Sequence, residues 1–414
     1  MKDDFTFIPV IIVGGGQAGL SMSYTLKEKE IPHLIFDRGQ TGDSWRKRWD
    51  NFTLVTPNWQ CEMPGYKYSG SEPHGFMNRE QVVQFVQDYA RSFDPPLKNG
   101  VEVFRVKKKS EEYIVETSIG NYRCYQVIIA AGAFHDVFIP PVAKKLPSHI
   151  QNMHSSQYRN ASSMPDQGIM VVGSGQSGCQ IAEDLHLEGK KVHLCIGDAP
   201  KSPRNYRGRD VVDWLDDMNY YDRPIDSFPD PEAVRKKTNH YLTGRDGGRE
   251  IDLRAFALEG MKLYGVFKDA DENKIYFGDN LTKDLDNADN SAQSIKDRID
   301  IYIEENNIQA PTEAPYVAPW RPEDETESID LVKEDIGVII WCVGYKTDFS
   351  WIDIPVFTEK GYPIYERGVT NEEGLYFLGL PWMYTWGSGR FSGITQDAWY
   401  LAERVAEKMV MDKV

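Results

Sequence analysis

Cysteine is scarce in this sequence, and the few cysteines lie far apart. The 414 residues include five of them, Cys61, Cys124, Cys179, Cys195 and Cys342, and no Cys-x-x-Cys pair occurs. Zinc knuckles and dithiol redox centres both require closely spaced cysteines, so the scatter excludes metal and dithiol sites of these kinds. An odd number of scattered cysteines is typical of reduced, mostly buried thiols in a cytoplasmic protein.

Long apolar runs and an excess of basic residues are missing as well. No apolar run approaches the ~20 residues that a membrane-spanning helix requires. The N-terminal stretch MKDDFTF is acidic where a secretory signal would be basic. The formal net charge of −16 repels the phosphates of nucleic acids and of anionic lipids. We therefore expect a cytoplasmic protein that binds small molecules, and neither nucleic acid nor a membrane.

The sequence is nevertheless rich in residues that form cores. Hydrophobic residues make up 41% of it, and it contains 22 tyrosines and 10 tryptophans. A single core stops growing at roughly 250–300 residues. A chain of 414 residues is therefore expected to form two or three domains, and nothing in the composition indicates disorder.

The first motif is a glycine loop near the N-terminus. An apolar run from Val10 to Val13 leads into Gly-x-Gly-x-x-Gly, a helical pattern follows, and the strand HLIFD ends at Asp37. Such glycines permit a tight turn, admit a pyrophosphate and let the helix pack on the strand, while the acid accepts ribose hydroxyls. A glycine turn that binds nothing is the alternative, but the ordered succession favours an adenine dinucleotide site. Its predicted contacts are Gly14, Gly16, Gln17, Ala18, Gly19, Asp37 and Arg38.

A second glycine loop, IMVVGSGQSGCQ, begins at Ile169 and repeats the spacing. In a gapless alignment of the two loops, Ile196 falls where Asp37 stands in the first, so the acid that would repel a 2′-phosphate is missing. Cations follow in KSPRNYRGRD, which favours NADPH over NADH, although Asp198 opposes this preference. The predicted coenzyme contacts are Gly173, Ser174, Gly175, Gln176, Ser177, Gly178, Lys201, Arg204 and Arg207, and Arg209 is the remaining cation of the cluster.

Two dinucleotide sites in one chain limit the function more than either site alone. One dinucleotide can stay bound while the other docks against it, and this arrangement passes hydride from a nicotinamide to a flavin. We therefore assign the first site to FAD and the second to NADPH, with NADH as the alternative.

The segment after Asp37 carries a family resemblance. It reads GDSWRKRWDNFTLVTPN from Gly42 to Asn58, and together with both glycine loops it resembles the class B flavin-dependent monooxygenases. This group holds the flavin-containing and the Baeyer-Villiger monooxygenases, and the likeness is in particular to their shorter bacterial relatives. The other motifs that carry the resemblance are VIIAAGAF (127–134), YRGRD (206–210), GVIIWCVGY (337–345) and GLYFLGL (374–380).

The resemblance implies an α/β fold with two Rossmann-like dinucleotide-binding domains, the NAD(P)H domain being inserted in a discontinuous FAD domain. The FAD domain would comprise residues 1–164 and 336–414. The NAD(P)H domain, with a family-specific insert, would comprise residues 165–335. The chain would cross between the two at Ala130–Gly132 and at Cys342–Tyr345.

By the same resemblance, residues outside the glycine loops reach the cofactor and the substrate. The aromatic side chains of PWMYTWGSGRFSG, before the last helix, would face the substrate, with packing at a domain seam as the alternative. The further FAD contacts expected are Trp45, Arg46, Thr56, Ala131, Gly132, Gly389 and Ser392. The substrate contacts expected are Trp382, Tyr384, Trp386 and Phe391.

A partial fingerprint precedes the second glycine loop. The family pattern F-x-G-x-x-x-H-x-x-x-[YFW] is matched by His154 and Tyr158, whereas Ser148 and Ile150 stand where Phe and Gly belong. The match indicates a hinge between domains. Baeyer-Villiger enzymes usually close the pattern with Trp, so Tyr158 favours oxidation of nitrogen or sulfur, and His154 is expected to be a hydrogen-bonded structural residue.

No protein nucleophile, metal cluster or carboxylate pair stands out, as expected where a cofactor supplies the chemistry. The resemblance implies an FAD-dependent NAD(P)H monooxygenase that forms a flavin hydroperoxide and inserts one oxygen atom of O₂ into a small organic substrate. N- or S-oxidation is favoured over Baeyer-Villiger oxidation. The alternatives are an NAD(P)H oxidase or flavin redox sensor, and a disulfide reductase, which the missing dithiol opposes. Asn58 and Arg207 are retained as candidates for a catalytic role, and a homodimer is compatible with the sequence.

Three further stretches bear on the organisation of the chain. Ile295, Ile299 and Ile303 recur every four residues, which predicts an amphipathic helix whose apolar stripe packs on the core. A meander of strands is expected around residues 101–117. The stretch 310–327, rich in proline and acid, is predicted to be a linker or a lid over the active site.

Overall fold

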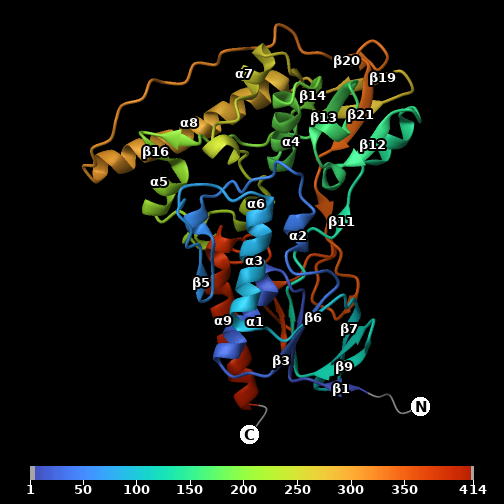
Figure 1. Cartoon of the computed structure of the whole chain (residues 1–414), viewed down its shortest axis with the longest axis vertical. Coiled ribbons are helices and arrows are strands. Elements are labelled where there is room, and N and C mark those ends of the chain that lie inside the picture. Colours follow the sequence, from blue (N-terminus) through green and yellow to red (C-terminus); the bar gives the residue numbers. More distant parts are fainter. Residues whose placement is uncertain (1–4, 412–414) are drawn as a thin grey trace.

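The computed structural model describes residues 5–411, and these form two lobes, one above the other in Figure 1. The lower lobe is drawn mainly in blue and red, the colours of the N-terminal and C-terminal parts of the sequence. The upper lobe is drawn in green, yellow and orange, the colours of the middle of the sequence. The second domain is therefore inserted in the first, as predicted.

The lower lobe is built on a seven-stranded sheet. Its strands lie in the order β24 (Tyr365–Glu366), β25 (Val369–Thr370), β26 (Leu375–Phe377), β10 (Gln126–Ile129), β2 (Val10–Val13), β3 (His33–Asp37) and β6 (Leu97–Asn99). The five strands from β26 to β6 are parallel. The apolar run VIIV of β2 is buried along its whole length, which is typical of a parallel strand whose sheet is covered on both faces.

Helices cover one face of this sheet and a second sheet covers the other. The helices are α1 (Gln17–Glu28), α2 (Asp43–Arg46), α3 (Arg79–Phe93) and α9 (Phe391–Met411). The second sheet has the order β1 (Thr6–Phe7), β9 (Gly120–Cys124), β8 (Glu112–Thr117), β7 (Val103–Lys109) and β23 (Ile352–Asp353), and it contains the expected meander. Alternate residues of β2 separate accordingly: Val10 and Ile12 belong to the core with the helices, and Ile11 and Val13 to the core with the second sheet.

The upper lobe repeats this plan with a five-stranded, fully parallel sheet. Its order is β12 (Gln151–His154), β21 (Ile336–Trp341), β13 (Gly168–Val172), β14 (Val192–Cys195) and β17 (Lys262–Tyr264). Antiparallel strands β18 (Phe267–Ala270), β19 (Lys274–Phe277) and β20 (Ser328–Asp330) share a core with it. The helices of this lobe are α4 (Gln176–Leu187), α5 (Val211–Asp217), α6 (Pro231–Lys236), α7 (Leu253–Leu258) and α8 (Leu281–Glu305).

Short elements complete the two lobes. The remaining strands are β4 (Glu62–Met63), β5 (Tyr66–Lys67), β11 (Asp136–Val137), β15 (Asn205–Tyr206), β16 (Arg209–Asp210) and β22 (Tyr345–Lys346). Short 3-10 helices lie at Asn58–Gln60, Pro141–Lys145, Ser155–Gln157, Ala161–Ser163, Ile225–Ser227 and Arg245–Gly247.

The predicted domain boundaries after residues 164 and 335 are wrong. Strands β12 and β21 pair with each other, Gln151 opposite Val338, and both belong to the sheet of the upper lobe. The chain crosses between the lobes at β11 and β22, which pair antiparallel. The error arises because pairing between β12 and β21, far apart in sequence, leaves no local signal at either boundary.

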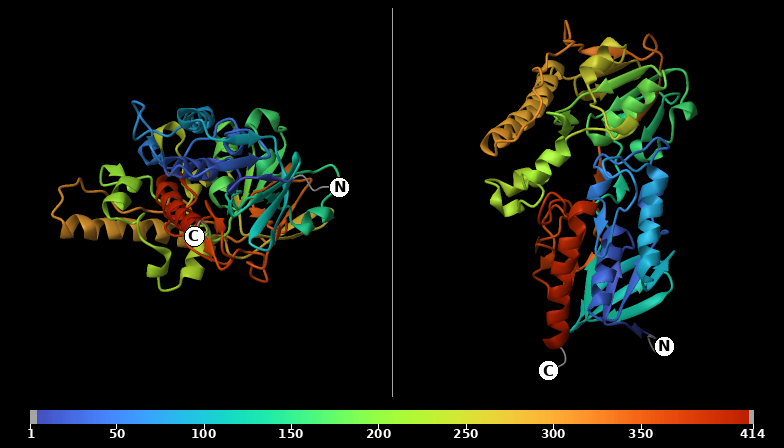
Figure 2. Two further views of the ribbon diagram at one scale, coloured as in Figure 1. Left: turned by 90° about the horizontal axis from the view of Figure 1, so that it is seen from below. Right: turned by 60° about the vertical axis from the view of Figure 1, so that its left-hand side comes forward.

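The predicted amphipathic helix is the C-terminal half of α8. Ile295 and Ile299 are buried against Val211 and Trp214 of α5, and Figure 2 shows the two helices side by side. The proline-rich stretch 310–327 does not form a lid, because it runs along α8 on the side away from the lower lobe (Figure 1). Its Glu325 accepts hydrogen bonds from the first backbone N–H groups of α8.

Truncation of the buried stripe of α8 tests this packing. Ile299→Ala removes a side chain that is 0% exposed, so we expect a loss of about 2–5 kcal/mol in the stability of the upper lobe. Ile301→Ala on the same helix is the matched control, because Ile301 is 53% exposed and surface truncations cost about 0.5 kcal/mol or less. Urea unfolding followed by circular dichroism measures both variants, and equal midpoints would contradict the packing.

Candidate active site

The first glycine loop has the shape of a phosphate cradle. Gly14 has a φ of +108°, and a Cβ on it would lie 2.4 Å from the carbonyl oxygen of Ala130. A Cβ on Gly19 would lie 1.8 Å from the carbonyl oxygen of Gly14. Both positions therefore exclude any other residue. Gly16, by contrast, has no atom within 4 Å of its Cβ position, so this face at the start of α1 is open for a pyrophosphate.

Asp37 fixes this loop from the end of β3. Its carboxylate accepts hydrogen bonds from the backbone N–H of Gly15, at 2.5 Å, and of Gly39, at 2.7 Å. Each carboxylate oxygen has a further lone pair for a ribose hydroxyl. Arg38 next to it is exposed. The arrangement fits the adenosine end of a dinucleotide.

Residues from the other end of the chain meet the first loop. The Gln17 side chain donates to the carbonyl oxygen of Gly389 at 2.8 Å, just before α9 begins. A Cβ on Gly379 would lie 2.6 Å from the Cβ of Ala18. The helical start of α1, the end of β26 and the start of α9 therefore converge, as FAD binding by residues from both ends of the chain requires. Of the other predicted FAD contacts, Ala131, Arg46 and Ser392 are exposed and Thr56 and Gly132 are half-buried.

The second glycine loop repeats this geometry. A Cβ on Gly173 would lie 2.8 Å from the carbonyl oxygen of Cys342, and one on Gly178 would lie 1.8 Å from that of Gly173. The Gln176 side chain donates to the backbone carbonyl oxygen of Leu242 at 2.6 Å. In the first loop the equivalent Gln17 also donates to a backbone carbonyl oxygen, that of Gly389. Gly175 has only Thr238 near its Cβ position, at 3.8 Å. The loop is therefore also open at its central glycine.

Strand register supports the equivalence of Ile196 and Asp37. Val13 pairs with Phe36 in the first sheet and Val172 with Cys195 in the second, so the next residues are Asp37 and Ile196 respectively. Ile196 is buried, and Asp198 beyond it is exposed. The hydroxyl of Ser174 accepts from the backbone N–H of Gly197 at 3.0 Å, which replaces the carboxylate bond of the first loop.

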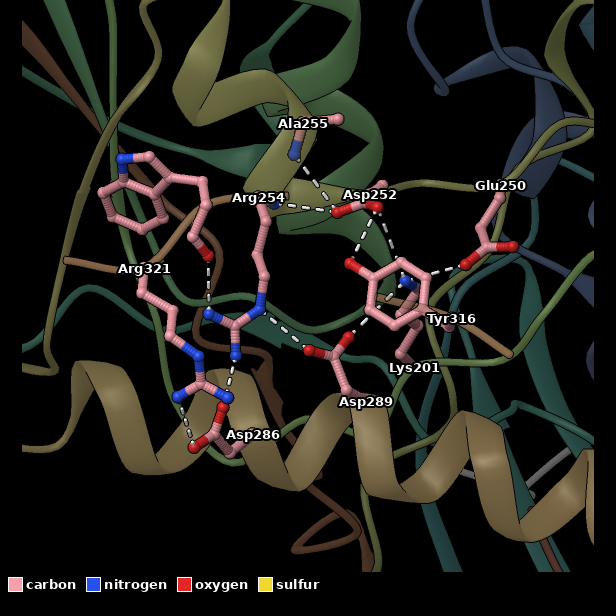
Figure 3. Close-up of polar contacts among 10 residues, drawn as sticks. Lys201, Glu250, Asp252, Arg254, Ala255, Asp286, Asp289, Tyr316 and Arg321 are labelled. Carbon is pink, nitrogen blue, oxygen red and sulfur yellow. Dashed lines mark hydrogen bonds and ion pairs between the residues drawn. The ribbon is translucent and has the colours of Figure 1, made fainter. Parts of the chain in front are cut away.

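Lys201 does not lie free at the coenzyme site. Figure 3 shows it surrounded by carboxylates, and its exposed fraction is 2%. Its Nζ lies 2.7 Å from Glu250 and 3.6 Å from Asp289, and 4.5 Å from the centroid of the Tyr316 ring. The same network fixes Arg254, whose guanidinium contacts Asp286 and Asp289. Lys201 is therefore part of the internal charge network of the upper lobe.

Arg204 is also buried, and it connects the two lobes. Both terminal nitrogens donate to the carbonyl oxygen of Val55 in the lower lobe, at 3.0 and 2.9 Å, and the guanidinium lies over the ring of Phe76. Burial lowers its pKa, and Asp210 at 3.5 Å opposes that shift. Arg204 thus holds the stretch that the resemblance places along the flavin, and its guanidinium is already engaged by protein groups.

The remaining predicted polar residues also have structural partners. Arg207 pairs with Asp300 of α8 at 2.8 Å and donates to the carbonyl oxygen of Pro311. Arg209 pairs with Asp217 at 2.7 Å. Asn58 is 3% exposed. Its side-chain amide donates to the carbonyl oxygen of Glu72 and accepts from the backbone N–H of Met77. These contacts argue against a catalytic role for Asn58 or Arg207, because both side chains are already engaged by the fold.

The predicted aromatic contacts pack at the seam between the lobes. Trp45 stacks on Phe391 with ring centroids 5.5 Å apart, next to the start of α9. Trp382 contacts Phe228 edge to face, and Trp386 lies 4.6 Å from the ring of Tyr221, both partners being in the upper lobe. Seam packing, the alternative to substrate contact, therefore accounts for these two side chains.

A buried acid, Asp397, lies next to an arginine that contacts the aromatic loop 381–393. Asp397 on α9 is 0% exposed, and burial raises its pKa to about 6. Its carboxylate lies 3.8 Å from Nε of Arg367, and the Arg367 guanidinium stacks on the ring of Tyr384 at 3.7 Å. The loop is therefore held in one conformation beside the start of α9.

A cavity of about 670 Å³ opens where the lobes meet. Trp59 and His74 of the lower lobe line it on one side, and residues of the segment Asn205–Asp217 line it on the other. The Trp59 indole donates to Asp213 across the seam at 2.9 Å. Sequence reasoning missed this cavity, because its two walls are far apart along the chain and share no motif.

The thiols are unsuited to redox exchange with a dithiol partner. Four of the five cysteines are buried, Cys342 is partly buried, and none forms a disulfide within residues 5–411. Burial raises the pKa of Cys61 and of Cys342 to about 12, and it raises those of the other three as well. Since the thiolate is the reactive form, these side chains carry no disulfide chemistry.

Neither a metal-binding cluster nor a membrane-spanning helix is found among residues 5–411. Across the described part of the chain, no three His, Cys, Asp or Glu side chains are grouped so as to hold a metal ion. Within residues 5–411, no helix combines the length and the apolar character needed to cross a membrane.

Comparison with known proteins places the chain in a family. Residues 11–218 match the family described as pyridine nucleotide-disulphide oxidoreductase. The chain is 30% identical over 397 residues, 95% of its length and 97% of the relative's, to an uncharacterized CzcO-like oxidoreductase of Geobacillus kaustophilus. The chain therefore belongs to the pyridine nucleotide-disulphide oxidoreductase family.

More distant similarities are to monooxygenases. The chain is 29% identical over 213 residues, 49% of its length and 54% of the relative's, to the probable indole-3-pyruvate monooxygenase YUCCA10 of Arabidopsis thaliana. A flavin-containing monooxygenase from Stenotrophomonas maltophilia shares its fold with a TM-score of 0.66 at 16% identity, over 98% of this chain and 100% of that one. The resemblance to flavin monooxygenases is confirmed, and the chain is a flavin-dependent oxidoreductase of a pyridine-nucleotide family.

The open central glycines allow the two sites to be tested separately. Gly16→Ala adds a methyl group into empty space, so we expect a folded protein that has lost most of its FAD, because the methyl occupies the pyrophosphate position. Gly175→Ala is the matched variant in the second loop and should keep FAD but lose reduction by NADPH. The ratio of flavin to protein absorbance measures the first effect, and full FAD content in Gly16→Ala would contradict the assignment.

Substitution of Lys201 distinguishes a structural cation from a phosphate ligand. Lys201→Met leaves Glu250 and Asp289 without their buried partner, so we expect a loss of about 3–5 kcal/mol in stability. Lys191→Met is the control, since Lys191 is exposed and 3.9 Å from Asp335. Thermal unfolding and the ratio of the KM values for NADPH and NADH are measured on both variants. A stable Lys201→Met protein with a selective rise in the NADPH KM would restore the phosphate assignment.

Proposed function

We propose that the chain is an FAD-dependent NADPH monooxygenase that forms a flavin hydroperoxide and inserts one oxygen atom of O₂ into a small organic substrate. The observation that carries the proposal is the pair of open glycine loops in one chain whose cysteines are scattered and are buried or partly buried. Hydride that enters from the coenzyme then has no closely spaced dithiol of this chain to reduce, and we take O₂ as the acceptor, in line with the chain's likeness to flavin monooxygenases. Bound FAD would accept the hydride and activate O₂.

The protein itself contributes binding, orientation and shelter from water. The starts of α1 and α9 meet through Gln17 and Gly389 to hold the flavin nucleotide. Arg204 holds the backbone at Val55 beside it. The cavity between Trp59 and the segment 205–217 is the space that we assign to the substrate.

We assign the coenzyme to the second loop with a revised set of contacts. The loop residues 173–178 remain, whereas Lys201 and Arg204 are replaced by the segment that faces the open side of Gly175. Thr238 lies there, and the exposed Lys237 precedes it. Lys237 is therefore the cation that we propose for the coenzyme phosphates.

Two features favour a nitrogen or sulfur nucleophile over a ketone. Tyr158 closes the linker pattern where Baeyer-Villiger enzymes usually have Trp. The substrate cavity is lined by four acids, Asp210, Asp213, Asp216 and Asp217, against Arg209 and His74, and this excess of acidic groups favours a basic substrate. A cytoplasmic location and a homodimer stay predictions.

Rapid mixing tests the oxygen chemistry directly. The enzyme is reduced anaerobically with NADPH, and in parallel with NADH, and is then mixed with oxygenated buffer while the flavin absorbance is followed. We expect a long-lived oxygenated flavin whose decay is accelerated by an amine or a sulfide.

Two other results of the rapid-mixing experiment would point to a different reaction. Acceleration by a ketone alone would select Baeyer-Villiger oxidation. Immediate reoxidation with stoichiometric release of peroxide, whatever substrate is added, would identify an oxidase and contradict oxygen insertion. The Gly16→Ala protein is the control, because a signal that survives the loss of FAD does not come from the flavin.

A further inference from the structure

A buried carboxylate joins the two lobes beside the second glycine loop. Asp184 lies on α4 and is 1% exposed. It receives 2.5 Å hydrogen bonds from the hydroxyl of Tyr158 and from the guanidinium of Arg245. The amide of Asn51, in the lower lobe, donates to it at 2.8 Å.

These partners come from both lobes. Asn51 follows the Trp45–Trp49 stretch of the lower lobe, whereas Tyr158, between β12 and β13, and Arg245 both belong to the upper lobe. Asp184 is therefore the point at which the coenzyme domain's first helix is fastened to the lower lobe.

The segment between β12 and β13 strengthens the same junction. The carbonyl oxygen of Arg159 accepts from the backbone N–H of Asp50 at 2.7 Å, and the Arg159 guanidinium donates to the carbonyl oxygen of Lys47 at 2.9 Å. The Asn160 amide donates to Asp50 at 2.6 Å. This segment of the upper lobe is thus bound to the FAD domain, and its Tyr158 connects that attachment to α4.

Because Asp184 lies on α4, its contact with Asn51 affects where the start of this helix lies. The second glycine loop would hold the coenzyme pyrophosphate at the start of α4, and Asp184 lies ~12 Å further along the helix at a rise of about 1.5 Å per residue. A small rotation about this point moves the start of the helix, and with it the nicotinamide. Transfer between two bound groups requires reacting atoms roughly 3–3.5 Å apart, and a displacement of about 1 Å can cost roughly a hundredfold in rate.

We propose that Asp184, through Asn51, is the positioning residue that orients the coenzyme domain for hydride transfer to the flavin; this rests on the proposed function. Asp184 touches neither cofactor, so its effect is on the geometry of the encounter and not on the affinity of either site. Coenzyme binding and FAD binding should therefore survive the loss of the contact, while the transfer step slows.

Asn51→Ala is the variant of choice because it removes the bond from the lower lobe only. Asn51 is exposed and Asp184 keeps Tyr158 and Arg245 as partners, so both lobes should fold. Flavin reduction by NADPH is followed anaerobically on the FAD-loaded protein at increasing coenzyme concentration. We expect unchanged FAD content, a half-saturating NADPH concentration within about twofold of the wild type, and a limiting reduction rate lower by about tenfold.

A charge variant at the same pair adds a readout that mere destabilisation would not produce. Asn51→Asp places a second carboxylate against Asp184 and should slow reduction further than Asn51→Ala. Asn121→Ala, at an exposed position on β9, is the matched control and should equal the wild type.

The outcomes separate this inference from the proposed function. Anaerobic reduction precedes any reaction with O₂, so an oxidase and a monooxygenase serve equally well. A limiting rate in Asn51→Ala equal to that of the wild type, or a loss confined to NADPH affinity, would overturn the positioning role and leave the proposed function intact. A wild-type protein that NADPH and NADH both fail to reduce would overturn the proposed function and the inference together.

Discussion

Both dinucleotide sites depend on a backbone contact that only glycine permits. Gly14 lies against the carbonyl of Ala130 and Gly173 against that of Cys342. Both carbonyls belong to strand ends from which the chain leaves one lobe for the other. The close packing that builds each loop therefore also places it beside a crossing. As a result, the two loops lie at the carboxyl ends of β2 and β13 next to the junction, where two dinucleotides can meet.

The junction combines polar bonds with aromatic packing. Asp184, Arg204 and Trp59 each bond a group of the other lobe. The bonds of Arg159 and Asn160 to Asp50, and the contacts of Trp382 and Trp386 with rings of the upper lobe, add to them, so that several side chains together hold one orientation of the lobes. A chemistry carried by cofactors is sensitive to this geometry, because the protein supplies orientation and not a nucleophile.

The charges of the upper lobe show how a motif can mislead. KSPRNYRGRD has the composition of a phosphate site, yet each of its four cations is paired within the protein. The acids that neutralise them come largely from α5, α8 and the loop before α7, for example Asp289 and Asp300 of α8. A buried cation without a partner would cost several kcal/mol, so the pairs of the buried Lys201 and Arg204 are needed for folding. Phosphate recognition must then rely on the loop backbone and on cations elsewhere.

The sequence by itself determined the parts of the protein whose signals are local. The two glycine loops, the acid at Asp37 and its absence at Ile196, the meander, and the apolar stripe through Ile295 and Ile299 all follow from spacing within a few turns or strands. The structure confirms each of them. Tertiary structure alone decided which charges meet across the fold. It buried Lys201 and Arg204, gave Asn58 backbone partners, and brought β12 beside β21. The reason is that pairing between distant segments depends on how whole sheets and helices pack, and no local pattern records that packing.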